Sequence, residues 1–323
     1  MKISVLKTKN PYLNLAIEEY LLKNSEEEYF LLWQNDPTVV IGKNQNAYTE
    51  VNVDYVRKNN INISRRITGG GAVYHDTGNL NYSFISKKDE EGINFARFAA
   101  PVIEALCAMG LNAVLSGRND ILIDDKKISG NAQTVFADRV LHHGTLLFDS
   151  EMDVLSAALN VDAEKLKSKA IKSVRSRVGN IKDFLKSDIT VEKFANEIKK
   201  YVIERYNAEE IEIECNDIIH KLKERNCSDE WLFPKSDYLS SFSINIKSRY
   251  DFGSIEIRLN LKNDTITDVC IFGDFFGTRD IAELNSLLIG IKKSDIALKI
   301  ATIKISDYIH GMSNSEFLEL VNK

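Results

Sequence analysis

The sequence of 323 residues has little cysteine and little proline, with four of each, and it contains no CxxC pair. Scattered cysteines argue against a zinc knuckle, a thioredoxin-like motif and a dense disulfide framework. Cys107 lies on the apolar face of a helical pattern, so we expect a buried, inert thiol. No stretch approaches the ~20 apolar residues of a membrane span, and MKISVLKTKN lacks the apolar run of a signal peptide. We therefore expect a cytoplasmic protein with no membrane partner.

An excess of positive charge is also missing. The formal net charge is −5 and the pI is about 5.7, so the overall field offers no general attraction for nucleic acid or anionic lipid. The hydrophobic fraction of 44% and the charged fraction of 28% are typical of globular proteins. At this length, we expect one large domain plus a smaller one and no nucleic-acid partner.

Helical and strand patterns are mixed along the chain rather than regularly alternating. Asn10-Pro11 opens a helical pattern, FLLW and TVVIG predict two strands around a turn, and NLNYSFIS predicts another strand. A helix is expected from about Asn94 to Gly110, and residues 119–148 predict an antiparallel meander. Helical patterns resume at residues 152–159 and after Thr190. This mixture predicts the α+β class.

A second unit is predicted to begin beyond about Tyr238. Apolar residues alternate strictly from Ile255 to Leu261, and Ile266 to Phe272 returns after a polar turn, which predicts a hairpin. Two or three short helices are expected to follow, the last opened by a capping box of Ser313 and Glu316. We expect domains at residues 1–240 and 243–323.

The stretch RRITGGGAVYHD, residues 65–76, places three consecutive glycines between paired arginines and a histidine. It matches neither a Walker A loop nor the GxGxxG spacing of a dinucleotide fold. Successive glycines let backbone N–H groups converge on an anion, and Arg65 or Arg66 could meet a phosphate or carboxylate. The alternative is a plain surface turn with solvated arginines, and the glycines alone do not decide between the two.

A second polar stretch is GRNDILIDDKKISGNAQ. Asn119 and Asp120 stand at a strand entrance, where an amide can contact a nucleotide and a carboxylate can hold Mg²⁺ beside phosphates, although such an Asp is often only a turn residue. Lys127 opens the next strand, where a lone lysine is usually solvated. Small residues after it permit the close approach of a ligand. Lys126 and Lys127 face opposite ways, and the KISG register favours Lys127.

Two further stretches carry histidine and basic residues. His142 and His143 are adjacent in a predicted strand, so they point to opposite faces and cannot easily share a metal; we expect one to face a site and the other to face outward or pack. KLKSKAIKSVRSRVGNI concentrates positive charge without an acid. It is either a solvated charge run or a loop that closes on phosphate.

Taken together, RRITGGGAVYHD, GRNDI, KISGNAQ, HHGTLL and SVRSRVGNI resemble the lipoate-protein ligase family in order and spacing. The resemblance covers about Pro11 to Asp183, and IFGDFFG at Ile271 to Gly277 is similar to the hallmark of the family's carboxyl-terminal accessory domain. It implies a biotin/lipoate ligase-like catalytic domain, related to the class II aminoacyl-tRNA synthetase core, with a mixed or antiparallel sheet and flanking helices.

The resemblance implies a two-step reaction. Lipoate and ATP, with Mg²⁺, give lipoyl-AMP and pyrophosphate, and the acyl group then moves to a lysine of an acceptor. The implied acceptors are lipoyl domains, either of the acyltransferase subunit of a 2-oxo acid dehydrogenase or the glycine cleavage H protein. A monomer is expected.

The resemblance also implies roles for individual residues. Lys127 is the catalytic lysine that contacts the lipoyl carboxylate and the α-phosphate. The implied lipoate and adenylate contacts are Arg66, Gly69, Gly70, Gly71, Ala72, His75 and His143. The implied ATP contacts are Asn119, Asp120, Lys127, Ser173, Val174 and Arg175, with Asp120 also a candidate for Mg²⁺.

Three other readings are weaker. A relative that transfers acyl groups through a cysteine thioester would need a cysteine in one of these stretches, and none has one. A biotin ligase would need a GRGRxGR-type loop, which is absent. A non-catalytic lipoate-binding module would not need Lys127 together with both nucleotide stretches. Preference for lipoate over octanoate stays open, because one apolar pocket discriminates poorly between such chains.

Overall fold

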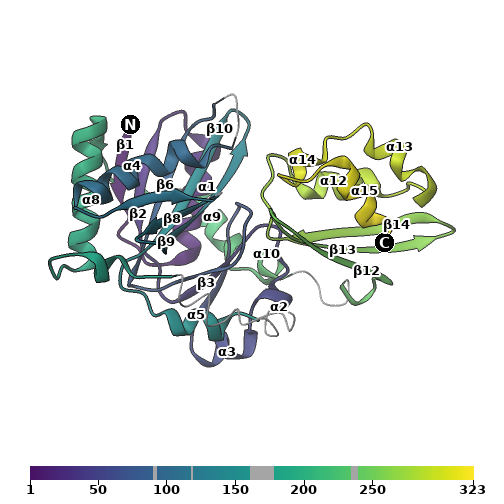
Figure 1. Ribbon diagram of the computed structural model, residues 1–323, viewed down its shortest axis with the longest axis horizontal. Coiled ribbons are helices and arrows are strands. Elements are labelled where there is room, and N and C mark those ends of the chain that lie inside the picture. Colours follow the sequence, from purple (N-terminus) through teal and green to yellow (C-terminus); the bar gives the residue numbers. More distant parts are fainter. Residues whose placement is uncertain (90–92, 118, 161–177, 234–238) are drawn as a thin grey trace.

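The computed structural model describes residues 1–89, 93–117, 119–160, 178–233 and 239–323 (Figure 1). A large unit contains the strands β1 to β11 with their helices, and a smaller unit contains β12 to β14 and the last helices. No helix within these ranges is both long and apolar enough to cross a membrane.

The main sheet of the large unit has eight strands in the order β11-β1-β2-β6-β10-β9-β8-β7. It is mixed, because β1 pairs in parallel with β11 and β2 whereas all other neighbours are antiparallel. The predicted meander is confirmed as β8, β9 and β10. The strands are β1 Lys2–Val5, β2 Tyr29–Trp33, β6 Asn79–Lys87, β7 Ala113–Ser116, β8 Asp120–Ile123, β9 Lys126–Phe136, β10 Arg139–Leu147 and β11 Glu209–Glu210.

A second sheet of three strands has the order β4-β3-β5, with β3 at Thr38–Ile41, β4 at Asn62–Arg65 and β5 at Val73–His75. The two strands predicted around Pro37 are both present, but they do not pair with each other. The first, β2, belongs to the main sheet, and the second, β3, is the centre of the small one. The chain therefore passes from the main sheet to the small one at this turn.

Helices cover both faces of the main sheet, so its central strands β2, β6 and β10 are buried on both sides. On one face, the core includes Phe30 and Tyr82 from the strands with Phe98 of α4 and Phe194 of α8. On the other face, Leu31 packs with residues of α1, and α9 lies against α1. The helices of the large unit are α1 Pro11–Asn24, α2 Ala47–Glu50, α3 Val53–Lys58, α4 Phe95–Ala108, α5 Met152–Ala158, η1 Ile181–Phe184, α8 Val191–Tyr206, α9 Asp217–Asn226 and α10 Asp229–Leu232.

The helix starts follow the sequence signals, but the prediction for Cys107 is wrong. Asn10 caps α1 by accepting from the Leu13 N–H, and Asn94 caps α4 in the same way. Cys107, near the end of α4, is exposed rather than buried. It lies in the last turn of the helix beside the buried stripe, which continues through Ala105 and Leu106.

The smaller unit is a three-stranded antiparallel sheet, with β12 Ile244–Tyr250, β13 Gly253–Lys262 and β14 Thr265–Gly273, and its helices cover one face (Figure 1). The predicted hairpin is confirmed as β13 and β14, and so is the capping box at Ser313. The expected two or three helices were too few, because short 3-10 and α turns at the end of the chain have weak periodicity. They are α12 Ile281–Leu288, η2 Lys293–Asp295, α13 Ile296–Ile300, α14 Ile305–Tyr308 and α15 Asn314–Val321.

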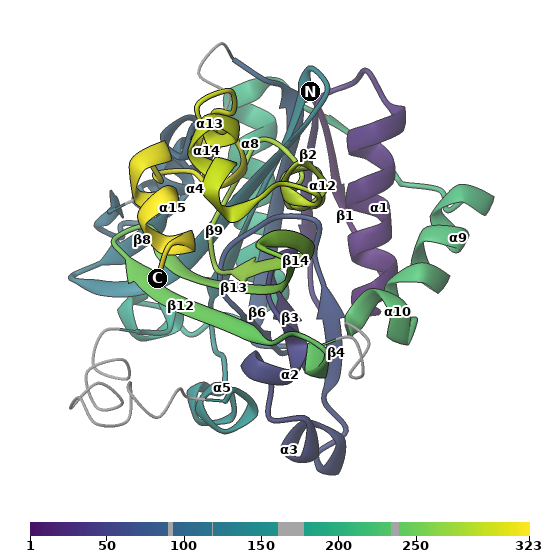
Figure 2. The ribbon, with the colours of Figure 1, turned by 90° about the vertical axis from the view of Figure 1, so that its right-hand side faces the viewer.

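The two units touch through the end of β14 and the segment that follows it. Figure 2 shows the smaller unit in front of the larger one. The Gly273 N–H donates to the Asn44 carbonyl at 2.9 Å, and the Gly70 N–H donates to the Phe275 carbonyl at 3.3 Å. Lys43 and Asp280 add an ion pair of 2.8 Å between Nζ and Oδ2. The motif IFGDFFG is therefore the part of the smaller unit that meets the glycine loop.

Candidate active site

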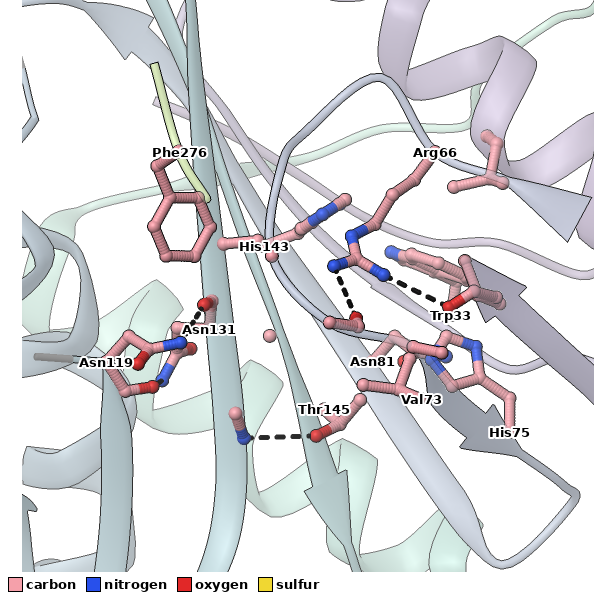
Figure 3. A pocket seen from close by; sticks show the side chains of 18 of the residues that line it. Trp33, Arg66, Val73, His75, Asn81, Asn119, Asn131, His143, Thr145 and Phe276 are labelled. Carbon is pink, nitrogen blue, oxygen red and sulfur yellow. Dashed lines mark hydrogen bonds between the residues drawn. The ribbon is translucent and has the colours of Figure 1, made fainter. Parts of the chain in front are cut away.

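A cavity of about 160 Å³ lies where the main sheet faces the small sheet and the glycine loop (Figure 3). One end is formed by apolar and aromatic side chains beside His75, and the other end carries Asn119. Lys127, which also lines the cavity, is ion-paired with the adjacent Asp120 at that end. The cavity lining is Leu15, Trp33, Val40, Arg66, Gly70, Gly71, Ala72, Val73, His75, Asn81, Asn119, Lys127, Gly130, Asn131, Ala132, His143, Gly144, Thr145 and Phe276. We call the Trp33 and His75 end the inner end and the Lys127 end the mouth.

The glycines between β4 and β5 are needed for close backbone approach. A Cβ on Gly69 would lie 2.2 Å from the Phe275 carbonyl oxygen, and one on Gly42 would lie 2.0 Å from the Gly70 oxygen. Gly70 has φ +91°, a conformation that residues with side chains rarely adopt. Gly71 has more room, since its added Cβ would meet nothing closer than 4.0 Å. The protein's own packing and backbone conformation therefore require glycine at positions 69 and 70, but not at position 71.

Arg66 holds the glycine loop rather than lying solvated at a surface turn. Its Nη2 donates to the carbonyls of Gly69 and Gly71, each at 2.8 Å, and its Nη1 donates to the Val40 carbonyl at 3.1 Å. Burial lowers the pKa of Arg66 to about 10, which leaves it charged at neutral pH. The loop carbonyls thus point inward to the guanidinium.

Arg65 faces away from the cavity. It donates to carbonyls of the α10 end at Trp231 and Leu232, at 2.8 and 2.6 Å, and to Gly42 and Gln45. Burial lowers its pKa to about 10 as well. Both arginines are buried, so the alternative of a plain turn with solvated arginines is wrong.

The histidines of this region are buried. Burial, and after it the charge of Arg66, lowers the pKa of His75 to about 3, so its ring is neutral at physiological pH. His143 lines the cavity, whereas His142 faces the opposite side of the sheet and stacks on Phe98 at 5.6 Å between ring centroids. Burial lowers the pKa of His142 too. The expectation that one histidine faces the site and the other packs is confirmed.

The mouth is built around Lys127. Its Nζ lies 2.7 Å from Asp120 Oδ1, and both side chains are about one third exposed, at 39% and 33%. A β-bulge shifts the register between β8 and β9 here, and Gly130 leaves room for the ammonium, since an added Cβ would lie 3.3 Å from Nζ. Lys126 is not part of the cavity lining, as the register argument predicted, and its side chain lies against Gly179.

Asparagines support this end of the cavity. Asn119 Nδ2 donates to the Asn131 carbonyl at 2.6 Å, and Asn131 Nδ2 donates back to the Asn119 carbonyl at 3.0 Å. The Tyr82 hydroxyl donates to Asn131 Oδ1. The Gly179 N–H donates to the Lys127 carbonyl at 3.0 Å, so the chain after the basic stretch returns beside this lysine.

The residues expected to form a site mostly come together. Those that line the cavity are Arg66, Gly70, Gly71, Ala72, His75, Asn119, Lys127 and His143. Two do not line it: Gly69 packs against the Phe275 carbonyl, and Asp120 reaches the site only through its ion pair with Lys127. Ser173, Val174 and Arg175 lie outside the described residues, as does the basic stretch from Lys165 to Arg177.

Sequence reasoning did not find three contributors. Trp33 resembles the end of an ordinary apolar strand. Phe276 belongs to the smaller unit and reaches the cavity beside Phe95 of α4, with 5.4 Å between the ring centroids. Glu18 lies in α1 with its side chain only 1% exposed, and its carboxylate accepts from His143 Nδ1 at 2.9 Å. An acidic residue beside Glu19 in a helix suggests a solvated face, so no local signal pointed to Glu18.

Metal ligands are sparse among the described residues, where no group of three His, Cys, Asp or Glu side chains could hold an ion. Asp120 is the carboxylate beside Lys127 at the mouth. Such a site fits Mg²⁺ held by one or two carboxylates together with substrate phosphates, and it does not fit an ion held by protein ligands alone.

Comparison with known proteins gives matches in both units. The family model described as the lipoyl protein ligase A/B catalytic domain matches residues 10–203, and the model of the bacterial lipoate protein ligase C-terminus matches residues 240–321. A curated relative, lipoate-protein ligase LplJ of Bacillus subtilis, is 43% identical over 323 residues, covering 97% of each chain.

Solved structures agree. The P. falciparum LipL1 structure in complex with lipoate superposes with a TM-score of 0.81 at 27% identity, over 98% of this chain and 97% of that one. A lipoate-protein ligase A structure bound with ATP has a TM-score of 0.60 at 28% identity, over 71% of this chain and 97% of that one.

Proposed function

This chain belongs to the lipoate-protein ligase family, and we propose that it activates lipoate with ATP and transfers the lipoyl group to an acceptor lysine. In the first step, a lipoate carboxylate oxygen bonds to the α-phosphorus of ATP and pyrophosphate leaves. In the second, the acceptor amine attacks the carbonyl of lipoyl-AMP, an amide forms, and AMP leaves with the amine proton lost to solvent.

One observation carries this proposal: a single cavity joins a buried inner end to a cationic mouth. Trp33, Val40 and the neutral His75 offer no net charge, which suits the apolar chain and ring of lipoate. Lys127 stands at the other end, where a carboxylate would lie. A carboxylic acid with a long apolar tail matches this division.

Lys127 is proposed to act on charge in both steps. Its ammonium would lie between the lipoate carboxylate and the α-phosphate, whose mutual repulsion opposes bond formation. In the second step, it would stabilise the negative charge that develops on the carbonyl oxygen and on the departing phosphate. To do so it exchanges its present partner Asp120 for the substrates, and its partial exposure makes that exchange inexpensive.

The remaining contacts are proposed by position. Gly71 and Ala72 would lie along the lipoyl chain. Arg66, which binds the Gly69 and Gly71 carbonyls, would hold the loop so that its N–H groups can face the ligand. Asn119 would contact the nucleotide, together with Ser173, Val174 and Arg175. Asp120 would hold Mg²⁺, which screens the charge of the phosphates when bound.

The acceptor is proposed to be a lipoyl domain, either of a 2-oxo acid dehydrogenase acyltransferase subunit or of the glycine cleavage H protein. Domains at residues 1–240 and 243–323 are proposed as a catalytic domain and an accessory domain, acting within one monomer.

The intact mass of a purified lipoyl domain, incubated with this protein and lipoate, tests the function. A lipoyl increment is expected only when ATP and Mg²⁺ are both present. Supplying lipoyl-AMP directly should bypass ATP and still give the increment. If several acceptor domains gain no mass under any of these conditions, the ligase proposal fails and a binding role without catalysis takes its place.

A further inference from the structure

Glu18 is a buried carboxylate that does not line the cavity, but hydrogen bonds connect it to residues that do. Its side chain is 1% exposed and lies in the middle of α1. Two branches of hydrogen bonds leave this carboxylate, and each reaches a different wall of the cavity. A buried carboxylate is costly unless it is hydrogen-bonded and balanced by charge, so its presence here calls for an explanation.

The first branch leads to the glycine loop. His143 Nδ1 faces Glu18 Oε1 at 2.9 Å, and because a carboxylate only accepts, this nitrogen carries the proton. The opposite nitrogen, Nε2, lies 2.8 Å from Thr68 Oγ1, which in turn accepts from Arg66 Nε at 2.9 Å. Arg66 then binds the carbonyls of Gly69 and Gly71.

The roles along this branch are mutually consistent. Arg66 donates to the Thr68 oxygen, the Thr68 hydroxyl donates to His143 Nε2, and His143 Nδ1–H donates to Glu18. Reversing the tautomer of His143 would leave its Nδ1 lone pair against a carboxylate. The Glu18 carboxylate thereby fixes the direction of the His143 and Thr68 hydrogen bonds, while Arg66 can only donate.

The second branch leads to the floor of the inner end. The Ser83 hydroxyl donates to the same Glu18 oxygen at 2.5 Å, and Trp33 Nε1–H donates to Ser83 Oγ at 2.7 Å. Trp33 lines the cavity and is itself 2% exposed. One carboxylate therefore fixes the indole on one side of the cavity and the loop on the other.

We propose that Glu18 is a positioning residue that sets the shape of the lipoate site from behind its walls. Burial lowers the pKa of the neighbouring Arg66, and the negative charge of Glu18 opposes that shift. Without this carboxylate, no single group would fix the His143 tautomer, the Arg66 orientation and the position of the Trp33 ring. This inference rests on the proposed function, since it takes the cavity to be the lipoate site.

Glu19 supplies a matched control. It is the next residue of α1, is equally buried at 1% exposure, and is also ion-paired, with Lys23 at 2.7 Å and with Arg225 at 2.5 Å. Burial alone would raise the pKa of Glu19, but hydrogen bonds from Arg225 and Lys23 lower it overall. Arg225 belongs to α9 and Lys23 to α1, and neither lines the cavity, so Glu19→Gln removes a buried charge without touching either branch.

The experiment compares Glu18→Gln with Glu19→Gln in three measurements: thermal unfolding, lipoate affinity by calorimetry, and the KM and kcat of lipoyl-AMP formation. Both variants should lose thermal stability. Glu18→Gln should also weaken lipoate binding and raise the lipoate KM by about 10- to 100-fold, because buried donors are left misaligned, with a smaller change in kcat. Glu19→Gln should change lipoate binding by no more than about twofold.

A spectroscopic reading separates this role from simple destabilisation. The chain has two tryptophans, so a Trp231→Phe background leaves Trp33 as the sole emitter. Glu18→Gln should shift the Trp33 emission in the folded protein, whereas Glu19→Gln should not. Equal effects of the two substitutions on lipoate binding and on emission would overturn the inference.

If Glu18→Gln does not fold, Thr68→Val still tests the first branch. It preserves the side-chain shape and breaks only the link between His143 and Arg66, so it should raise the lipoate KM while leaving the Trp33 emission in place. An unchanged KM would contradict the first branch. Failure of the ligase proposal would look different, because the wild-type protein itself would then form no lipoyl-AMP.

Discussion

The inner end and the mouth of the cavity are built in opposite ways. At the inner end, His75, His143 and Arg66 are all less than a tenth exposed, and the Arg66 guanidinium is occupied by protein acceptors. At the mouth, Lys127 and Asp120 are about one third exposed and bind each other. The inner end is thus fixed before any ligand arrives, whereas the Lys127 ammonium at the mouth is held by an ion pair that a ligand can replace.

This difference in rigidity agrees with the function proposed for each end of the cavity. An apolar chain is bound by shape and burial, which favour rigid walls with no unpaired polar groups. Adenylate formation moves charge between a carboxylate, phosphates and a leaving group, so its cation must be able to change partners. A lysine as buried as Arg66 would make that exchange slow and costly.

Among substitutions at the two ends of the cavity, Lys127→Ala should have the largest effect on lipoyl-AMP formation. Removal of the mouth cation should lower the kcat of lipoyl-AMP formation by about 10²- to 10³-fold, while lipoate still occupies the inner end. Single-turnover formation of lipoyl-AMP measures this. Lys126→Ala is the control, because its side chain lies outside the cavity and activity should stay near normal. Near-normal activity of Lys127→Ala would remove that residue from the mechanism.

The second effect is a pH dependence of stability that belongs to the inner end. Burial lowers the pKa of His75 from an ordinary 6.5 to about 3, so below pH 6.5 the unfolded chain takes up a proton that the folded chain refuses. The free energy of unfolding should therefore fall as the pH drops from about 6.5 toward 3, with a loss of about 2 kcal/mol from this residue by pH 5.

Denaturant unfolding of the wild type and His75→Gln, measured from pH 8 to pH 5, checks this sign. The variant should show a shallower loss of stability toward acid pH, with the remaining slope due in part to His142, whose pKa is lowered as well. Parallel slopes would mean that His75 is not held neutral by the fold.

A third effect concerns the glycine loop, where Gly70 and Gly71 are adjacent but differently constrained. Gly70→Ala should lower the free energy of unfolding by about 1 to 2 kcal/mol, because φ is +91° and the new Cβ would lie 3.0 Å from Arg66 Nη2 and Phe276. Gly71→Ala should change it much less, since its nearest neighbour is 4.0 Å away. Thermal unfolding of the two variants compares them, and equal losses would place the strain elsewhere.

How much of this site could be predicted from the sequence depends on how locally each part is encoded. The glycine loop, the Lys127 register and the opposed histidines follow from short-range rules of backbone sterics and strand alternation. Glu18 and Phe276 do not, because Glu18 meets a residue 125 positions away and Phe276 arrives from the other unit. The α+β class followed from the mixed helix and strand patterns, and the ligase-like architecture followed from the resemblance. The separation of β2 and β3 into two sheets depends on pairing that no local pattern specifies.

The smallest effect on the free energy of unfolding is expected from the loss of the ion pair at the mouth. Asp120→Asn breaks the pair with Lys127, yet both groups remain partly in water, so the free energy of unfolding should change by less than about 1 kcal/mol. The same variant should need more Mg²⁺ for half-maximal lipoyl-AMP formation, because the carboxylate nearest the proposed phosphate site is gone. Unfolding curves and a Mg²⁺ titration measure the two effects separately. A loss of stability as large as that of Glu19→Gln would mean that the mouth is as rigid as the interior, and the contrast between the two ends would fail.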